Sequence, residues 1–367
     1  MNILFTCGGT AGHINPAVAL ARMFQERDGA NILFVGADGG MATRLVPKEG
    51  FPIRTVTISG FRRSVTPAAI GHNLGTAVNL VRSAGQAKAI LKDFKPDLVV
   101  GTGGYASYPV VKAAARMGIP TAVHESNALP GLTTKALARV ADRVMVGFAE
   151  SRDYYADPDR VVVTGTPVRG DFFSRTRAEA RRELGIDDDR PLVVSFFGSL
   201  GASVMNGYVT VMLSRAMDRG APFRWIHGGG RNYSSILAGL DGKQADGIEV
   251  REYIYDMPLV MAAADLVICR SGASTISELA ALAKPAILIP SPNVTADHQT
   301  KNALVLSKAG GAVLLPEKEC DPTGLYTLVE DLLQHPEKRR EMSRKLSELS
   351  VPDANEKIYR TLKGLLR

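Results

Sequence analysis

The sequence predicts an α/β protein made of two Rossmann-like, doubly wound parallel-sheet domains. Short apolar runs alternate with helix-period stretches along the whole chain, as in parallel sheets covered by helices. The chain has 367 residues, more than the roughly 250–300 that one core usually supports. The segments "NILFTCGGTAGHINPAVALARMF" and "PLVVSFFGSLGASVMNGYVTVML" both read strand, glycine loop, helix. Each is therefore predicted to open its own sheet.

The predicted elements follow from the period of the apolar residues. Strands are expected in the first half at 2–7, 31–36, 97–103, 121–126 and 143–147. Strands are expected in the second half at 191–198, 223–229, 265–272 and 285–291. Helix-period stretches cover 15–26, 108–118, 275–283 and 355–367.

The domain boundary is expected within 163–173, the segment "VTGTPVRGDFF". This gives a first domain over 1–166 and a second over 167–349. The helix predicted at about 350–367 either completes the second domain or packs back on the first. In open α/β sheets, ligands bind outside the carboxyl ends of the strands, so the sequence predicts a site in an interdomain cleft.

Composition is that of an ordinary soluble globular protein, with 45% hydrophobic and 22% charged residues. No apolar run is long enough to span a membrane, and no signal peptide is recognised. The three cysteines are far apart, which argues against a disulfide framework and for a reducing cytoplasm. No cysteine or histidine spacing suggests a structural zinc site.

The net charge of +7 is concentrated in residues 54–95. This segment has one acid, Asp93, and seven basic residues: Arg54, Arg62, Arg63, Arg82, Lys88, Lys92 and Lys95. A basic, apolar helix can lie on an anionic membrane or bind nucleic acid. Few aromatic residues lie among the basic residues, which weakens the hypothesis that this segment binds nucleic acid. An ordinary amphipathic helix with a solvated basic side is the simplest interpretation.

Two glycine loops in the first half follow predicted strands. "GGTAGHINP", residues 8–16, places His13 where a helix begins, either as a general base or phosphate ligand or as a helix cap. "GTGGYA" fits GxGxxA at Gly101, Gly103 and Ala106, with Glu125 downstream. That fingerprint favours a dinucleotide oxidoreductase, but it lies in a middle βαβ unit rather than the first.

The second half contains further polar loops after strands. In "CRSGASTISELAAL", Arg270 adds positive charge at a helix N-terminus suited to a diphosphate. Glu278 either binds a ribose diol or closes a capping box with Thr275. Asp297, His298, Gln299 and Thr300 suit sugar hydroxyls or form a surface loop. Asp187 and Asp189 have the DxD spacing of metal-dependent sugar transferases, although a solvated turn is the simpler reading.

Taken in order, these motifs resemble one family over about residues 5–306. They are "GGTAGHINPAVALA", "GTGGYASYP", "HESNALPGLTTKALARVAD", "VTGTPVR", "FGSLGASVMN", "YIYDM", "VICRSGASTISEL" and "ADHQTKNA". The sequence is similar to the bacterial enzymes that add N-acetylglucosamine to lipid-linked muramyl-pentapeptide in peptidoglycan synthesis. The resemblance implies a B-type glycosyltransferase fold and a role in cell-wall biogenesis, cell shape and division.

The resemblance also implies the chemistry. UDP-N-acetylglucosamine is the expected donor and undecaprenyl-pyrophosphoryl muramyl-pentapeptide the acceptor. Transfer to the acceptor 4-hydroxyl is expected to proceed with inversion and without a bound metal or other cofactor. A lipid-linked acceptor implies a peripheral location at the cytoplasmic face of the cell membrane. No nucleic-acid partner is implied.

Site residues carry over by motif. The expected catalytic residues are His13, as base, and Glu278, on the ribose. Donor contacts are expected from Thr10, Ala11, Gly12, Asn127, Arg169, Ser199, Ile254, Arg270, Ser271, Gly272, Ala273, Ser274, Gln299 and Thr300. The acceptor pyrophosphate is expected at Gly9, Gly103, Gly104 and Tyr105. Membrane docking is expected from Arg62, Arg63, Arg82 and Lys88.

Three positions depart from the family pattern: Ala11 replaces Gly, Ser126 replaces Gln, and Thr300 replaces a second Gln in a common variant. Ser126 puts a side-chain role at that position in doubt. Three alternatives stay open: a sugar-nucleotide epimerase of the same fold, a dinucleotide oxidoreductase and a non-catalytic sugar-nucleotide-binding module.

Overall fold

The computed structural model describes residues 1–59, 66–198, 202–294, 297–351 and 353–366, without the side chains of 67–75, 77 and 78. The chain forms two compact units. The first unit combines Met1–Val168 with Val351–Arg367, and the second is Arg169–Ser350. The C-terminal helix thus belongs to the first unit.

Every pairing between neighbouring strands of the first unit is parallel. In the described part of the unit, the strands are β1 (Asn2–Thr6), β2 (Asn31–Ala37), β3 (Ile53–Val56), β4 (Leu98–Gly101), β5 (Thr121–Glu125), β6 (Arg143–Val146) and β7 (Val161–Val163). The sheet order is β3-β2-β1-β4-β5-β6-β7. The strand order reverses between β1 and β4, and such a reversal is where doubly wound sheets bind ligands.

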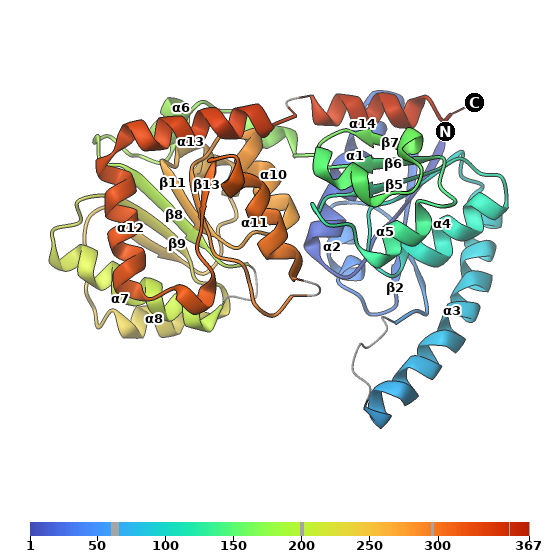
Figure 1. Ribbon diagram of the computed structural model, residues 1–367, viewed down its shortest axis with the longest axis horizontal. Helices are drawn as coiled ribbons and strands as arrows, with labels where there is room; N and C mark the ends of the chain where they lie inside the picture. The colour runs from blue at the N-terminus through green and yellow to red at the C-terminus, as the bar shows by residue number, and fades with distance from the viewer. Residues whose placement is uncertain (60–65, 199–201, 295–296, 352, 367) are drawn as a thin grey trace. The chain divides into compact units, whose positions relative to one another are not determined.

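Helices cover both faces of this sheet (Figure 1). They are α1 (Ala11–Asp28), α2 (Ala42–Lys48), α3 (Pro67–Phe94), α4 (Ser107–Arg116), α5 (Leu132–Leu137) and α14 (Ala354–Lys363). Alternation along β1 divides the core, because Ile3 and Phe5 pack with α1, α2 and α14 while Leu4 packs with α3, α4 and α5. The apolar residues of β1 thus serve two separate cores.

The second unit repeats this plan. Its strands within the described residues are β8 (Leu192–Phe196), β9 (Arg224–Gly228), β10 (Ile248–Arg251), β11 (Leu266–Cys269), β12 (Ala286–Leu288) and β13 (Ala312–Leu314). The order is β10-β9-β8-β11-β12-β13, again parallel, with the reversal between β8 and β11. Its helices are α6 (Arg177–Glu183), α7 (Ser203–Asp218), α8 (Tyr233–Gly239), α9 (Met257–Ala263), α10 (Ala273–Ala281), α11 (His298–Lys308), α12 (Pro322–Gln334) and α13 (Pro336–Leu349).

The predicted α/β class and both parallel sheets are confirmed. All nine predicted strands are present, and four short strands were missed: β3, β7, β10 and β13. β3 and β7 lie at the two edges of the first sheet, and β10 and β13 at those of the second. Edge strands contact one neighbour only, so they carry a weaker apolar pattern. Within the described residues, no helix is both long and apolar enough to cross a bilayer.

Helix α14 is fixed to α1 by apolar and polar contacts. Ile358 and Leu362 are fully buried in the core that contains Phe24. Tyr359 donates a hydrogen bond to Asp28, and the Lys363 ammonium lies 2.9 Å from the same carboxylate. The pKa of Asp28 is lowered, chiefly by its hydrogen bond with Lys363. The C-terminal segment is therefore part of the first unit's core.

Leu362→Ala is expected to destabilise the first unit by about 2–5 kcal/mol, since it leaves a cavity in a packed core. Hydrogen exchange of the β1 and β2 amides measures the loss. Arg360→Ala, on the exposed side of the same helix, is the control and is expected to change protection by less than about 0.5 kcal/mol. Equal protection in the Leu362→Ala variant and the wild type would mean that α14 is not part of the core.

Candidate functional site

In the first unit, the loops after β1 and β4 are tied together at the strand-order reversal. The Thr102 amide donates to the Thr6 carbonyl at 3.0 Å. The Ser107 hydroxyl bonds the carbonyls of Thr6 at 2.9 Å and Gly103 at 2.8 Å. The glycine loops at 8–10 and 103–105 therefore form one surface.

Two glycines allow these loops to touch. Gly104 has φ +78°, and a Cβ there would lie 2.2 Å from the Gly8 carbonyl oxygen. Gly103 has φ +105°, and a Cβ there would lie 2.6 Å from His13 Nδ1. Because only glycine fits both the backbone angle and the space, His13 rests directly on the second loop. The structure thus brings His13 into contact with Gly103, and Gly104 into contact with Gly8.

Helix α1 presents an open N-terminus beside His13. Thr10 is the N-cap and makes no side-chain capping bond. The amides of Ala11 and Gly12 have no hydrogen-bond acceptor among the described residues. The alternative that His13 caps the helix is wrong, since Thr10 holds that position. The open amides suit an anionic or polar group.

The loop after β5 contains a buried carboxylate that shapes the loop. Glu125 accepts hydrogen bonds from the Asn127 amide at 3.0 Å, the Asn127 side chain at 2.9 Å and the Gly131 amide at 3.0 Å. Glu125 is 3% exposed. A carboxylate held in this way is not available for a ribose diol, which contradicts the role that the dinucleotide alternative requires.

Ser126 has an internal partner rather than a free side chain. Its hydroxyl lies 3.3 Å from His124 Nδ1, and His124 Nε2 lies 3.0 Å from the Gly165 carbonyl. Both residues are buried. Burial lowers the pKa of His124 and favours the neutral ring. Ser126 therefore supports the loop that carries Asn127.

In the second unit, α10 begins at the strand-order reversal, and no side chain forms a capping hydrogen bond at its N-terminus. Gly272 is its N-cap, so the predicted capping box of Thr275 and Glu278 is wrong. The buried Ser274 hydroxyl has no hydrogen-bond partner among the described residues. Gly272, Ala273 and Ser274 thus offer open amides and a hydroxyl to an anion. Ser199 lies outside the described residues.

Glu278 lies further along α10 and has no hydrogen-bond or ion-pair partner in the described part of the chain. Burial raises its pKa to about 8, while the positive charge of Arg169 opposes the shift. Arg169 itself is bound by Asp171, with nitrogen–oxygen distances of 3.2 and 2.8 Å. An acidic side chain without a protein partner has an oxygen that can accept a hydrogen bond from an external donor such as a diol.

Glu278→Gln is expected to raise the unfolding temperature of the ligand-free protein above pH 8, by about 2–4 °C for each kcal/mol regained. An unfolded glutamate titrates near 4.3, and folded Glu278 at about 8. The native state therefore binds the extra proton, and Glu278 lowers stability progressively as pH rises through this window. Thermal unfolding at pH 4 and pH 8.5 tests this. A variant that matches the wild type at both pH values would contradict it.

The predicted nucleobase contact, Ile254, has a buried side chain and open backbone groups. Its side chain packs on Gly228, where an added Cβ would lie 3.2 Å from Ile254 Cδ1. Neither peptide group of Ile254 forms a hydrogen bond with a described residue. A free amide and carbonyl at a fixed position can pair with the edge of a base.

The predicted sugar-binding residues form hydrogen bonds with each other and with neighbouring residues. The Ser291 amide donates to Gln299 Oε1 at 2.8 Å, and the Ser271 hydroxyl donates to the Gln299 carbonyl at 2.8 Å. Thr300 donates to Asp297 at 2.6 Å. Arg270 bonds two carbonyls and Glu317. Arg270 thus has protein partners at both of its Nη atoms.

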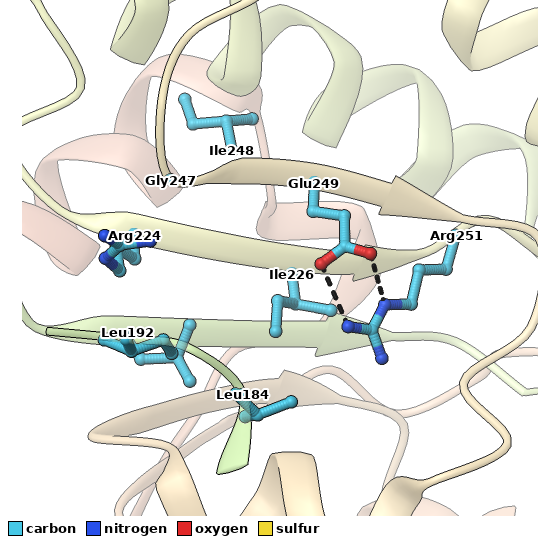
Figure 2. A pocket seen from close by; sticks show the side chains of 9 residues that line it. Leu184, Leu192, Arg224, Ile226, Gly247, Ile248, Glu249 and Arg251 are labelled. Carbon is cyan, nitrogen blue, oxygen red and sulfur yellow. Dashed lines mark hydrogen bonds and ion pairs between the residues drawn. The ribbon is translucent and has the colours of Figure 1, made fainter. Parts of the chain in front are cut away.

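A cavity of about 150 Å³ lies elsewhere, on β8, β9 and β10 (Figure 2). It is lined by Leu184, Ile186, Leu192, Arg224, Ile226, Gly247, Ile248, Glu249 and Arg251. Glu249 and Arg251, both on β10, form a two-bonded ion pair at its wall, with distances of 2.7 and 2.9 Å. None of the predicted site residues lines this cavity.

The two aspartates with the DxD spacing are not part of a metal-binding group in the described residues. Asp187 and Asp189 are exposed, whereas Asp188 binds Arg224 and Arg190. These hydrogen bonds, that from Arg224 foremost, lower the pKa of Asp188 well below its ordinary value. Within the described residues, no three His, Cys, Asp or Glu side chains are grouped to hold a metal ion.

Sequence reasoning missed Glu317 and Asp171, the carboxylate partners of Arg270 and Arg169. Glu317 lies 47 residues after Arg270, so no local pattern could connect them. Asp171 could have been found, because it follows Arg169 by two residues in "VRGDFF". An acid so close to a predicted phosphate ligand is a usable signal.

Comparison with known proteins gives one consistent result. Residues 3–146 match the model of the glycosyltransferase family 28 N-terminal domain, and residues 192–358 that of the C-terminal domain. Two curated relatives are named UDP-N-acetylglucosamine–N-acetylmuramyl-(pentapeptide) pyrophosphoryl-undecaprenol N-acetylglucosamine transferase. The protein from Acetivibrio thermocellus is 42% identical, covering 100% of this chain and 99% of its own. That from Ruminiclostridium cellulolyticum is 40% identical, with 100% of both chains covered.

Solved structures agree on the fold. The crystal structure of MurG from Acinetobacter baumannii is similar at TM-score 0.77 and 28% identity, covering 99% of both chains. UDP-GlcNAc 2-epimerase from Neisseria meningitidis is similar at TM-score 0.65 and 15% identity, covering 99% of this chain and 100% of its own. At 15% identity the likeness shows the fold alone.

Proposed function

Since this chain belongs to glycosyltransferase family 28, we propose that it transfers N-acetylglucosamine from UDP-N-acetylglucosamine to lipid-linked muramyl-pentapeptide. The product is the lipid-linked disaccharide precursor of peptidoglycan. The observation that carries the donor half is the open N-terminus of α10 in the same unit as the partnerless Glu278. The first supplies amides for a diphosphate, and the second an acceptor for a ribose diol.

We propose that the reaction inverts the anomeric carbon. His13 removes the proton from the acceptor 4-hydroxyl as the oxygen attacks C1 of the donor sugar, and UDP leaves from the opposite face. The bond to C1 forms as the C1–O bond to the diphosphate breaks, so charge develops on UDP. The α10 amides stabilise this charge together with Arg169, and no bound metal is required in this scheme.

In this proposal, the acceptor pyrophosphate lies on the joined glycine loops at Gly9, Gly103, Gly104 and Tyr105. The open amides of Ala11 and Gly12 lie beside His13 at the N-terminus of α1. His13 rests on Gly103, so acceptor binding and base placement share one scaffold. This arrangement holds the hydroxyl beside its base.

The epimerase alternative has weaker support. Similar epimerase structures are 13–15% identical to this chain, whereas relatives named as transferases are 40–42% identical over its full length. Incubation of the protein with UDP-N-acetylglucosamine alone separates the two functions. A transferase leaves the donor sugar unchanged when no acceptor is present. Conversion to the 2-epimer would contradict the proposed function.

We also propose that α3 docks the protein on an anionic membrane, where the lipid-linked acceptor resides. Arg82 and Lys88 are exposed on α3, and neither forms an ion pair with a described residue. Val81, which precedes Arg82 on the same helix, is 77% exposed. Arg62 and Arg63 lie outside the described residues. Basic and apolar groups on one helix suit the surface of a bilayer.

Replacing Arg82 and Lys88 by Gln is expected to weaken binding to anionic liposomes on the order of tenfold or more at low salt, since each basic residue contributes roughly 1 kcal/mol. Turnover of a short-chain acceptor is expected to stay unchanged. The control removes the same charge at Lys357 and Arg360 on α14, which packs on the other face of the sheet. Equal liposome binding by both variants would contradict docking through α3.

A further inference from the structure

Protein groups hold the Arg270 side chain in place. Its Nη1 donates to the carbonyls of Ile289 and Pro290 at 3.1 Å each, and its Nη2 bonds the Glu317 carboxylate. The guanidinium carbon lies 5.8 Å from the centroid of the Phe197 ring. The two charged side chains are only 13% and 18% exposed. This ion pair is therefore largely removed from water.

The segment that Arg270 holds is hydrogen-bonded to Gln299. Ser291 follows the bonded carbonyl of Pro290, and its amide donates to Gln299 Oε1 at 2.8 Å. Ser271 follows Arg270, and its hydroxyl donates to the Gln299 carbonyl at 2.8 Å. Ser291 thus fixes the side chain of Gln299, and Ser271 fixes its main chain. Both residues are next to groups that Arg270 positions.

A further bond closes this set of contacts. The fully buried Asn302 donates to the Ser271 carbonyl at 3.2 Å, joining α11 to the start of α10. Since Gln299 Oε1 already accepts from Ser291, the Gln299 NH₂ group is the part left for a ligand, and it has no partner among the described residues. The amide nitrogen is therefore presented in a defined orientation, as a donor.

We propose that Glu317 is a positioning residue for the donor sugar, acting through Arg270 and the 289–291 segment to orient the Gln299 amide. This rests on the proposed function and adds to it a residue that touches no substrate. It also changes the role of Arg270, which the sequence suggested as a direct partner of the leaving diphosphate. A largely buried ion pair of this kind fixes geometry, and loss of one partner leaves the other uncompensated.

The two roles predict different binding patterns. If Arg270 bonded the diphosphate directly, UDP and UDP-N-acetylglucosamine would depend equally on its surroundings. If Glu317 and Arg270 orient Gln299, only the ligand that carries the sugar depends on them. The ratio of the two dissociation constants therefore separates positioning from direct phosphate contact. A general loss of stability would weaken binding of both ligands and leave this ratio unchanged.

The test measures dissociation constants of UDP and UDP-N-acetylglucosamine by calorimetry for the wild type and Glu317→Gln. The expected result is binding of the sugar nucleotide weakened about tenfold or more, with UDP binding changed less than about twofold. The matched control is Glu330→Gln, because Glu330 is also 18% exposed and paired with an arginine, Arg219. That variant is expected to bind both ligands as the wild type does.

A double-mutant comparison tests the path through Gln299. Gln299→Ala is expected to weaken binding of the sugar nucleotide as much as Glu317→Gln does. The double variant is expected to weaken this binding no further. Additive losses, or equal weakening of UDP, would overturn the proposal. Glu317→Asp, which keeps the charge, is expected to show a smaller shift of the same ratio and serves if the Gln variant does not fold. A wild type that binds neither nucleotide would overturn the proposed function itself.

Discussion

His13→Ala is expected to lower kcat about 10²–10⁴-fold, the usual contribution of a general base. The reason is geometric as well as chemical. The His13 ring rests against Gly103, and its carbonyl accepts a hydrogen bond from Thr102 at 2.7 Å. The side chain is therefore fixed beside the two glycine loops proposed to bind the acceptor pyrophosphate.

The measurement is steady-state transfer to a short-chain acceptor, with donor binding determined separately. Donor affinity is expected to change little, since the nucleotide is proposed to bind residues of the second unit. The wild-type pH profile should fall at acidic pH as the base is protonated, and the variant's profile should lose that limb. Wild-type kcat in the variant would remove His13 as the base while leaving the transfer reaction possible.

Gly104→Ala is expected to lower transfer to the acceptor by about 10-fold or more and to destabilise the first unit by roughly 2–5 kcal/mol. A left-handed backbone costs a residue with a Cβ roughly 1–2 kcal/mol, and forced overpacking typically adds about 1–3 kcal/mol. Here the added Cβ would lie 2.2 Å from a main-chain oxygen, that of Gly8. The two loops must separate, which also moves the support of His13.

Gly118→Ala is the matched control. Gly118 has φ +72°, close to the +78° of Gly104, but a Cβ there meets nothing within 4 Å. It therefore carries the backbone strain without the clash. Thermal unfolding and the KM for the acceptor measure the difference. If both variants lose the same stability and the same activity, the contact between Gly8 and Gly104 has no special role.

The architecture was predictable because the apolar runs of central strands are long and continuous. β1, β4, β8 and β11 are buried on both faces, so "NILFT" and "LVIC" stand out from the sequence. A doubly wound sheet reverses its strand order once, and the glycine loops follow β1 and β4, the two strands between which the first sheet reverses. By contrast, the edge strand β13 is three residues long and gave no separate signal.

The candidate site was predictable where chemistry follows a strand end directly. His13, Gly103, Gly104 and the start of α10 lie at the strand-order reversals, as their positions after apolar runs indicated. Side-chain partners could not be predicted in the same way. The capping box at Glu278 fits the sequence pattern, yet α10 begins at Ala273, so Thr275 lies inside the helix.

Contacts across long stretches of sequence explain the remaining differences. Arg270 looked free because its partner is 47 residues away. Glu125 looked available because only the folded loop shows its three hydrogen bonds, two to Asn127 and one to Gly131. In both cases a charged side chain suggested a ligand contact, and the fold assigns it to the support of a loop.

The central claim is sugar transfer, and one measurement tests it most directly. The protein is incubated with UDP-N-acetylglucosamine labelled in the sugar and a short-chain lipid-linked muramyl-pentapeptide, with EDTA present. The proposed function predicts that label moves to the lipid-extractable product and that UDP is released in equal amount. Label that stays with the nucleotide, from protein that binds the donor, would contradict it.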